Sequence, residues 1–288
     1  MAPAGPLDPE RIDRATEHCR TLGLEPVLFP AAALRWGYLA GTDEERLADL
    51  QSAFDDPTVD AVWALRGGYG TLRILDRLSL VRQRRDPIPF IGFSDNTTIH
   101  VRHAAIGVIS FHGPHPSSEI PAETEASFAA VLFSEEPAGP LPRRSGDPPA
   151  LPLVPGRVEA PLFGGNLTLL AALCGSGDAP SARGRILFLE EHGEPTYRVD
   201  RLLVQLQRSG TLEGVAGLAF GRFTGAPAEG ARTPQLIEEV ALQLAVPAVA
   251  DLPFGHVAHN CTLPVGARAV LDGQAATLSI VEGAVKAA

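Results

Sequence analysis

The sequence predicts an α/β protein, with a parallel Rossmann- or flavodoxin-like α/β domain in its N-terminal half and a strand-rich α/β domain in its C-terminal half. Short apolar runs alternate with helical patterns through residues 1–115, and a second series of apolar runs begins near residue 158. A proline-rich stretch separates the two series. Strands that alternate with helices form parallel sheets with right-handed crossovers, which gives the fold class.

Start signals indicate two helices in the N-terminal half. Asp8 followed by Pro9 is typical of a helix N-terminus, and Thr42–Glu45 matches a capping box. Leucines spaced by three in Leu72–Leu78 suggest a third helix. Three apolar runs of strand length are expected to be buried strands of the parallel sheet: Ala61–Leu65, Ile88–Phe93 and Val108–Phe111.

The proline-rich stretch is predicted to connect the two domains. Seven prolines lie between Pro137 and Pro155. Proline has no backbone N–H, so such a stretch suits an extended connection. The expected division is therefore an N-terminal domain over residues 1–136, a linker over 137–157 and a C-terminal domain over 158–288.

The C-terminal half is expected to end in a hairpin that turns at Asp272-Gly273. It opens with Gly164–Asn166, which leads into the apolar run Leu167–Leu173. The strand candidates are Arg185–Leu189, Val215–Phe220, Val246–Ala250, Ala267–Leu271 and Ala276–Val281.

Composition excludes several classes of protein. The formal net charge of −10 disfavours nucleic acid as a partner, because an acidic chain repels phosphates. Cys19, Cys174 and Cys261 are far apart in the sequence, which argues against a disulfide framework and a clustered zinc site. Residues 1–9 lack a signal-peptide pattern, and no apolar run reaches about 18 residues, so we expect no membrane span and a cytoplasmic location.

A candidate nucleophile lies where an apolar strand meets a helix start. The strand ends in Gly92-Phe93-Ser94 and is followed by Asp95-Asn96. A serine at such a turn presents its hydroxyl at the carboxyl edge of a sheet, beside a helix N-terminus that stabilises negative charge. The pattern Gly-x-Ser-x-Gly is incomplete because Asn96 replaces the last glycine. The alternative is that Ser94 or Asp95 only caps the helix.

Three further segments contain residues suited to acyl-transfer chemistry. The glycines of Arg66–Gly70 let backbone N–H groups approach an oxyanion, the carboxylates of Glu190–Glu194 could orient a histidine, and His256 follows a strand and could act as a base. Each has a plainer alternative: a tight turn, a solvated acidic loop and a structural histidine. His112 and His115 are more typical of structural histidines than of metal ligands.

Together these segments resemble the LD-carboxypeptidase family of serine peptidases, which also includes the microcin C immunity peptidases. The matching segments occur in the family's order and span nearly the whole chain: Trp36–Thr42, Arg66–Gly70, Ile91–Asp95, Ser110–Pro114, Phe163–Leu167, Leu189–Glu190, Glu194–Arg201, Gly255–His256 and Leu263–Gly266. The resemblance implies a triad of Ser94 as nucleophile, Glu190 as acid and His256 as base, with the backbone N–H groups of Gly68 and Asp95 as the oxyanion hole. It also implies that both domains contribute to the site.

The chain departs from the family pattern at two places. It opens with Met1–Pro6 where relatives usually have a strand, so this strand is either missing or supplied differently, and its absence would expose or shorten part of the parallel sheet. Glu191 directly follows Glu190, and side chains alternate in direction along a strand, so only one of the two can face His256. The resemblance favours Glu190, which leaves Glu191 directed toward solvent or the domain interface.

The resemblance implies hydrolysis of an L,D-peptide bond, with release of terminal D-alanine from a murein tetrapeptide in cell-wall recycling. It implies a small muropeptide substrate and neither a cofactor nor a metal, and it leaves a homodimer open. Two alternatives share the architecture: a microcin-immunity-type peptidase that cleaves toxic peptide–nucleotide conjugates, and a catalytically silent muropeptide-binding protein. An unrelated α/β-hydrolase esterase is disfavoured by the incomplete serine motif and by the proline-rich boundary within the triad.

Overall fold

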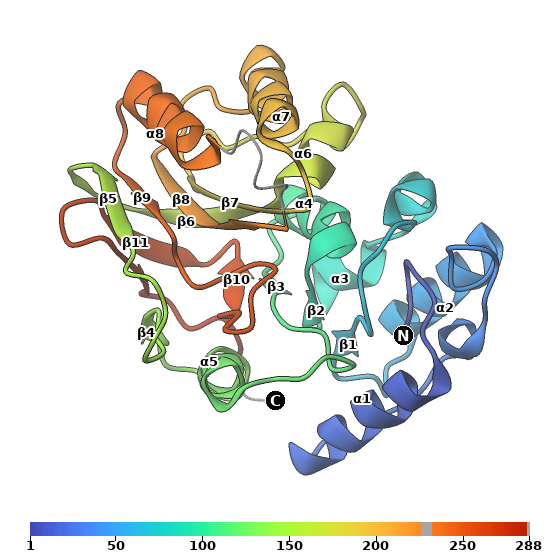
Figure 1. Ribbon diagram of the computed structural model, residues 1–288. Coiled ribbons are helices and arrows are strands. Elements are labelled where there is room, and N and C mark those ends of the chain that lie inside the picture. The colour runs from blue at the N-terminus through green and yellow to red at the C-terminus, as the bar shows by residue number, and fades with distance from the viewer. Residues whose placement is uncertain (226–231, 287–288) are drawn as a thin grey trace. The chain divides into compact units, whose positions relative to one another are not determined.

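The computed structural model describes residues 1–225 and 232–286. The chain divides into two compact units, Met1–Ile120 and Pro121–Ala288, each with its own helices and strands (Figure 1). Parallel strands alternate with helices in the N-terminal unit, and a larger sheet dominates the C-terminal unit, so the predicted fold class is confirmed. Within the described ranges, no helix has the length and apolar character needed to cross a bilayer.

The N-terminal unit contains the predicted parallel sheet. Val62 pairs with Phe90 and Ile91 pairs with Phe111, both in parallel register. The strands are β1 (Val62–Trp63), β2 (Phe90–Gly92) and β3 (Ser110–His112), and the helices are α1 (Pro9–Thr21), α2 (Asp43–Asp55), α3 (Val81–Arg85) and α4 (Thr97–Ala105). Short 3₁₀ turns lie at η1 (Pro30–Ala33), η2 (Thr71–Arg73), η3 (Leu75–Arg77) and η4 (Ser94–Asn96).

One local signal in this unit is confirmed, and one predicted helix has a different form. The capping box at the start of α2 is confirmed, because Thr42 Oγ1 accepts from the Glu45 N–H at 3.3 Å and Glu45 Oε2 accepts from the Thr42 N–H at 2.8 Å. The helix expected over Leu72–Leu78 is instead the pair of 3₁₀ turns η2 and η3. The leucines there repeat every three residues, which is the period of a 3₁₀ helix and not of an α-helix.

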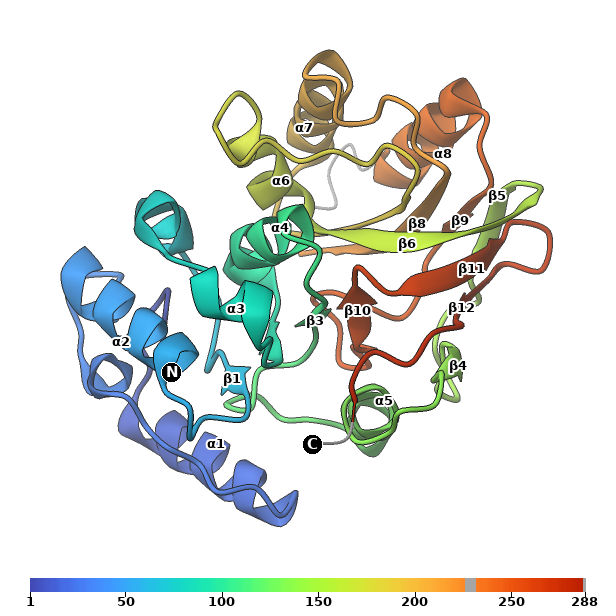
Figure 2. The same ribbon diagram turned by 180° about the vertical axis from the view of Figure 1, so that it is seen from behind.

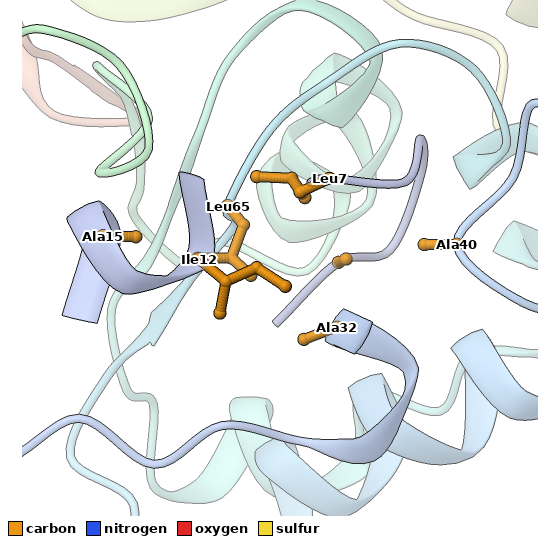
Figure 3. Close-up of a cluster of buried hydrophobic side chains, with 7 residues drawn as sticks. Leu7, Ile12, Ala15, Ala32, Ala40 and Leu65 are labelled. Atoms are coloured by element: carbon orange, nitrogen blue, oxygen red, sulfur yellow. The ribbon is translucent and has the colours of Figure 1, made fainter. Parts of the chain in front are cut away.

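The first residues of the chain are buried beside β1. The Leu65 N–H donates to the Met1 carbonyl at 2.8 Å, and the Gly5 N–H donates to the Gly67 carbonyl at 3.1 Å. Of the two alternatives, a missing strand or one supplied differently, the structure has the second, since an irregular but paired segment covers this edge. It contributes to the apolar cluster of Figure 3, which comprises Ala2, Leu7, Ile12, Ala15, Ala32, Ala40 and Leu65.

The C-terminal unit is built on an eight-stranded mixed sheet in the order β4-β12-β11-β6-β7-β8-β9-β5. Its strands are β4 (Gly139–Pro140), β5 (Leu151–Val154), β6 (Arg157–Asn166), β7 (Ile186–His192), β8 (Gly217–Thr224), β9 (Ala248–Ala250), β11 (Arg268–Asp272) and β12 (Thr277–Ile280), and β10 (Leu263–Val265) lies between β9 and β11 in sequence. Strands β6 to β9 run parallel, and β11 and β12 form the predicted hairpin.

Four helices belong to the C-terminal unit: α5 (Ala122–Leu132), α6 (Leu167–Leu173), α7 (Thr196–Arg208) and α8 (Thr233–Leu244). Figures 1 and 2 both show α6, α7 and α8 along one face of the sheet formed by β6 to β9. Helix α7 buries Val199, Leu203 and Leu206, which recur at helical spacing. The parallel strands are consequently buried on the helix-covered face as well as on the other.

The proline-rich stretch differs from the expected linker. The division of the structure falls between Ile120 and Pro121, and the stretch itself supplies β4 and β5, which are the two edge strands of the C-terminal sheet. An edge strand tolerates proline because one side of its backbone needs no hydrogen-bond donor. Asp147 anchors the stretch further, since its carboxylate accepts from His259 Nδ1 at 2.7 Å and pairs with Arg222 at 3.5 Å.

Candidate active site

Ser94 lies at a sharp strand-to-helix turn in the N-terminal unit. Strand β2 ends at Gly92, and Ser94 opens the η4 turn that runs into α4. The backbone of Ser94 is left-handed, with φ +62°, a conformation that non-glycine residues rarely adopt. A Cβ on Gly92 would lie only 3.1 Å from that of Ala64, so a side chain at this position would be crowded. The local geometry is that of a nucleophile elbow.

The glycine-rich loop after β1 packs directly against this serine. A Cβ placed on Gly67 would lie 2.8 Å from Ser94 Cβ and 3.3 Å from the Asp95 nitrogen. Gly68 follows with φ +110°, a conformation suited to glycine. The two segments predicted to form the oxyanion hole, at Gly68 and Asp95, therefore lie side by side within the N-terminal unit.

Thr71 connects the glycine loop to the serine turn, a role for which the sequence contains no local signal. The Thr71 N–H donates to Asp95 Oδ2 at 2.9 Å, and Thr71 Oγ1 donates to the Asp95 carbonyl at 2.6 Å. Thr98 Oγ1 in turn donates to Thr71 Oγ1 at 2.8 Å. Asp95 is 1% exposed, and burial raises the pKa of its carboxyl group while the bonds from Thr71 oppose that rise.

Asn96 stands where the elbow pattern would have its second glycine. Its Nδ2 donates to the Phe93 carbonyl at 3.1 Å and to the Arg66 carbonyl at 3.3 Å, so the amide also ties the turn to the glycine loop. His115 stacks on Phe93 with ring centroids 4.3 Å apart, and its Nε2 is 3.2 Å from Asn96 Nδ2. His115 thus lies in the packing around the turn.

The predicted acid and base meet in the C-terminal unit. His256 Nδ1 donates to Glu190 Oε2 at 2.6 Å, and the Glu190 side chain is fully buried at the end of β7. Burial by itself would lower the pKa of His256, but the hydrogen bond and the negative charge of Glu190 outweigh it and hold the pKa above the ordinary 6.5. Because Nδ1 donates to Glu190, the neutral ring has Nε2 available to accept a proton.

Gly255 allows this close approach. Its φ is +98°, and a Cβ there would lie 2.6 Å from Glu190 Cβ and 2.8 Å from Glu190 Cγ. The Gly255 N–H donates to Asn260 Oδ1 at 2.8 Å, which holds the loop that carries His256. A side chain at position 255 would separate the acid from the base.

Glu191 has a different set of partners from Glu190, as strand alternation predicts, but it does not point into solvent. It is 4% exposed, and its Oε2 accepts from both the N–H and the Oγ1 of Thr168 at 2.8 Å. Its Oε1 accepts from Asn166 Nδ2 at 3.3 Å and from the His192 N–H at 2.8 Å. Of the two expected directions, the one toward solvent is therefore wrong. Glu191 fastens β7 to the start of α6, and burial raises the pKa of its carboxyl group.

The predicted residues thus form two groups. Ser94, Gly68 and Asp95 are gathered in the N-terminal unit, and Glu190 and His256 are gathered in the C-terminal unit. Among the described residues, no cluster of three or more His, Cys, Asp or Glu side chains is arranged to hold a metal ion. The chemistry available is that of a strained serine, a glycine-lined backbone and a carboxylate-oriented imidazole.

Comparison with known proteins connects both groups to one family. The LD-carboxypeptidase N-terminal domain matches residues 1–113, and the LD-carboxypeptidase C-terminal domain matches residues 159–271. A Streptomyces coelicolor protein assigned as a carboxypeptidase is 40% identical over 97% of this chain and 91% of its own length. The murein tetrapeptide carboxypeptidase of Pseudomonas aeruginosa is 34% identical over 95% of this chain and 92% of its own length.

Solved structures agree with these matches. The muramoyltetrapeptide carboxypeptidase of Oxalobacter formigenes superposes with a TM-score of 0.84 at 32% identity, over 97% of this chain and 96% of that protein. The microcin C7 self-immunity protein MccF has the same fold, with a TM-score of 0.88 at 22% identity. Since the two domain matches together cover most of the sequence, the chain belongs to the LD-carboxypeptidase family.

Proposed function

We propose that this protein is a serine-type LD-carboxypeptidase that releases the terminal D-alanine from murein tetrapeptides. The relatives named for murein tetrapeptide or muramoyltetrapeptide carboxypeptidase activity are 32–34% identical to it over nearly their whole length, which supports this substrate class. The proposed catalytic residues are Ser94, Glu190 and His256, with the backbone N–H groups of Gly68 and Asp95 as the oxyanion hole.

In the proposed reaction, His256 Nε2 takes the proton of Ser94 Oγ as that oxygen attacks the carbonyl carbon of the scissile amide. The N–H groups of Gly68 and Asp95 stabilise the resulting oxyanion. The protonated His256 then gives its proton to the leaving amine of D-alanine, and water releases the acyl group from Ser94. Glu190 accepts from His256 Nδ1 throughout and stabilises the imidazolium form.

The observation that carries the proposal is the 2.6 Å hydrogen bond from His256 Nδ1 to the fully buried Glu190. A carboxylate is costly to bury unless it has a partner, and here the partner is an imidazole, which can exchange a proton at its second nitrogen. The left-handed backbone of Ser94 supports the assignment of the nucleophile independently, because such strain is concentrated at functional turns.

Turnover of a murein tetrapeptide to tripeptide and D-alanine tests the proposal. We expect Ser94→Ala to lose about 10⁴- to 10⁶-fold in kcat without unfolding. Ser79→Ala is the matched control, because Ser79 is exposed and bonds through its backbone. Retention of more than about a tenth of the activity by Ser94→Ala would exclude Ser94 as the nucleophile.

Two assays separate the proposal from its alternatives. A fluorophosphonate probe should label the wild type and Ser79→Ala but not Ser94→Ala, whereas a silent muropeptide-binding protein would bind the peptide without being labelled. An immunity-type peptidase would cleave an aminoacyl sulfamoyl adenosine in preference to the tetrapeptide. Cleavage of the tetrapeptide alone supports the proposed function.

A further inference from the structure

His192, which the proposed triad does not include, lies against the ring of His256. The two imidazoles stack nearly parallel, with centroids 4.9 Å apart and an angle of 15° between their planes. His192 is exposed and closes β7, two residues after Glu190. His256 therefore has a carboxylate on one ring nitrogen and a second imidazole on its face.

A hydrogen-bonded chain holds the stack in place. Thr224 Oγ1 donates to the His256 carbonyl at 3.2 Å, and His192 Nδ1 lies 2.9 Å from the same Thr224 oxygen. A hydroxyl has one proton, and Thr224 gives it to the carbonyl, so His192 Nδ1 is the donor to Thr224. The chain thus links the ring of His192 to the backbone of His256 and selects the Nδ1–H tautomer of His192.

The sheet is irregular where this contact forms. The register of β7 against β8 shifts between Leu189 and Glu191, and after the shift His192 lies opposite Thr224. Gly225 then makes room for the ring, since a Cβ there would lie 2.7 Å from His192 Cε1. A bulge of this kind re-aims side chains, and here it directs His192 onto the face of His256.

We propose that His192 is a positioning residue for His256, which it holds by ring stacking in the plane needed for proton transfer. This inference rests on the proposed function. The bond to Glu190 acts on one atom of the His256 ring, and the stack with His192 acts on the face of the ring. The stack opposes tilting of the ring out of its plane, so that Nε2 keeps its direction through both proton transfers.

The test compares His192→Phe and His192→Ala with His18→Phe, which removes an imidazole from the other unit and is the matched control. Phenylalanine keeps the stacking surface, so we expect kcat within about threefold of wild type, whereas His192→Ala should lose about tenfold to a hundredfold in kcat with little change in KM. Equal losses in the two variants, or no loss in His192→Ala, would overturn the positioning role.

A second readout does not depend on turnover. The NMR signals of the His256 ring protons, assigned with His256→Gln, should lose the ring-current shift of the stack in His192→Ala, keep most of it in His192→Phe and be unchanged in His18→Phe. Unchanged ring-proton signals in His192→Ala would overturn the stacking of the two rings. If no form of the protein cleaved a murein tetrapeptide, the proposed function would fail, and these NMR signals would still decide whether the rings are paired.

Discussion

Replacing each of the two adjacent carboxylates with glutamine should separate catalysis from stability. In Glu190→Gln the amide oxygen can still accept from His256 Nδ1, so packing is kept while the negative charge opposite the imidazolium is lost. The loss of such an acid costs about 10⁴ in kcat, or about 5.5 kcal/mol of transition-state stabilisation. We expect that loss for Glu190→Gln in the release of D-alanine from a murein tetrapeptide.

The same change should move the pH dependence. Glu190 raises the pKa of His256 above 6.5, and turnover needs the neutral imidazole, so the acid limb of kcat/KM should shift to lower pH in Glu190→Gln. A raised folded-state pKa stabilises the fold below the unfolded pKa, and this contribution is lost as pH rises through the folded pKa. Glu190→Gln should therefore lower Tm more at pH 5 than at pH 9, when both are measured by circular dichroism.

Glu191→Gln should show the opposite pattern. The carboxylate of Glu191 accepts two hydrogen bonds on each oxygen, and an amide NH₂ would face two donors instead of accepting from them. Unsatisfied buried donors cost about 1–3 kcal/mol, which lowers Tm by roughly 3–10 °C in a protein of this size. We expect kcat to fall less than about tenfold, because Glu191 does not contact His256.

Glu213→Gln is the control for both, since Glu213 is exposed and pairs with an exposed arginine. A greater loss of kcat in Glu191→Gln than in Glu190→Gln would refute the assignment of the acid. Small losses of kcat in both Glu190→Gln and Glu191→Gln would show that another group orients His256, despite the short distance between His256 and Glu190.

Three further changes test other parts of the site. Thr71→Val removes the hydroxyl that ties the glycine loop to the serine turn, and it should lower kcat by about tenfold to a hundredfold with KM little changed, whereas Thr71→Ser should restore turnover. Gly255→Ala forces a Cβ to within 2.6 Å of Glu190 Cβ at φ +98°, so both kcat and Tm should fall. Burial raises the pKa of Asp147, but the bonds from His259 and the Arg144 N–H and the charge of Arg222 together outweigh burial and lower it, so Asp147→Asn should lower Tm at pH 7 and have progressively less effect as pH falls through the lowered pKa.

Elements that depend on neighbouring residues could be predicted from the sequence. The capping box of α2, the buried strands β7 and β8 and the β11–β12 hairpin all follow from local composition and period. The edge strands could not be foreseen, because Pro140 pairs with Ser279 and Leu151 pairs with Ala250, far away along the chain. The seven prolines predicted a linker because the local sequence does not show that these residues pair at the edges of a sheet, where proline is tolerated.

In the candidate site, too, the features that depend on neighbouring residues could be predicted, and those that depend on tertiary packing could not. The turn at Ser94 could be inferred from an apolar strand that ends in Gly-x-Ser, and the structure gives that serine a left-handed backbone. The contacts of Thr71 with Asp95 and of His192 with His256 had no local signal. They depend on a loop folding back onto a turn and on a register shift, both of which are set by tertiary packing.

The burial of Glu191 has a specific cause. Strand alternation correctly predicts that Glu191 and Glu190 have different partners, but it does not show whether the side of β7 away from His256 is exposed to solvent. Such a side is exposed in a sheet that has one face in solvent, whereas β6 to β9 are parallel and α6, α7 and α8 cover this face (Figure 2). A carboxylate on that side must therefore find donors inside the protein, and the nearest are the backbone and side-chain groups of Thr168 at the start of α6, where negative charge is favoured. In this parallel sheet, the two adjacent acidic residues near the end of β7 are consequently both interior groups: Glu190 is paired with His256, the proposed base, and Glu191 with the start of α6.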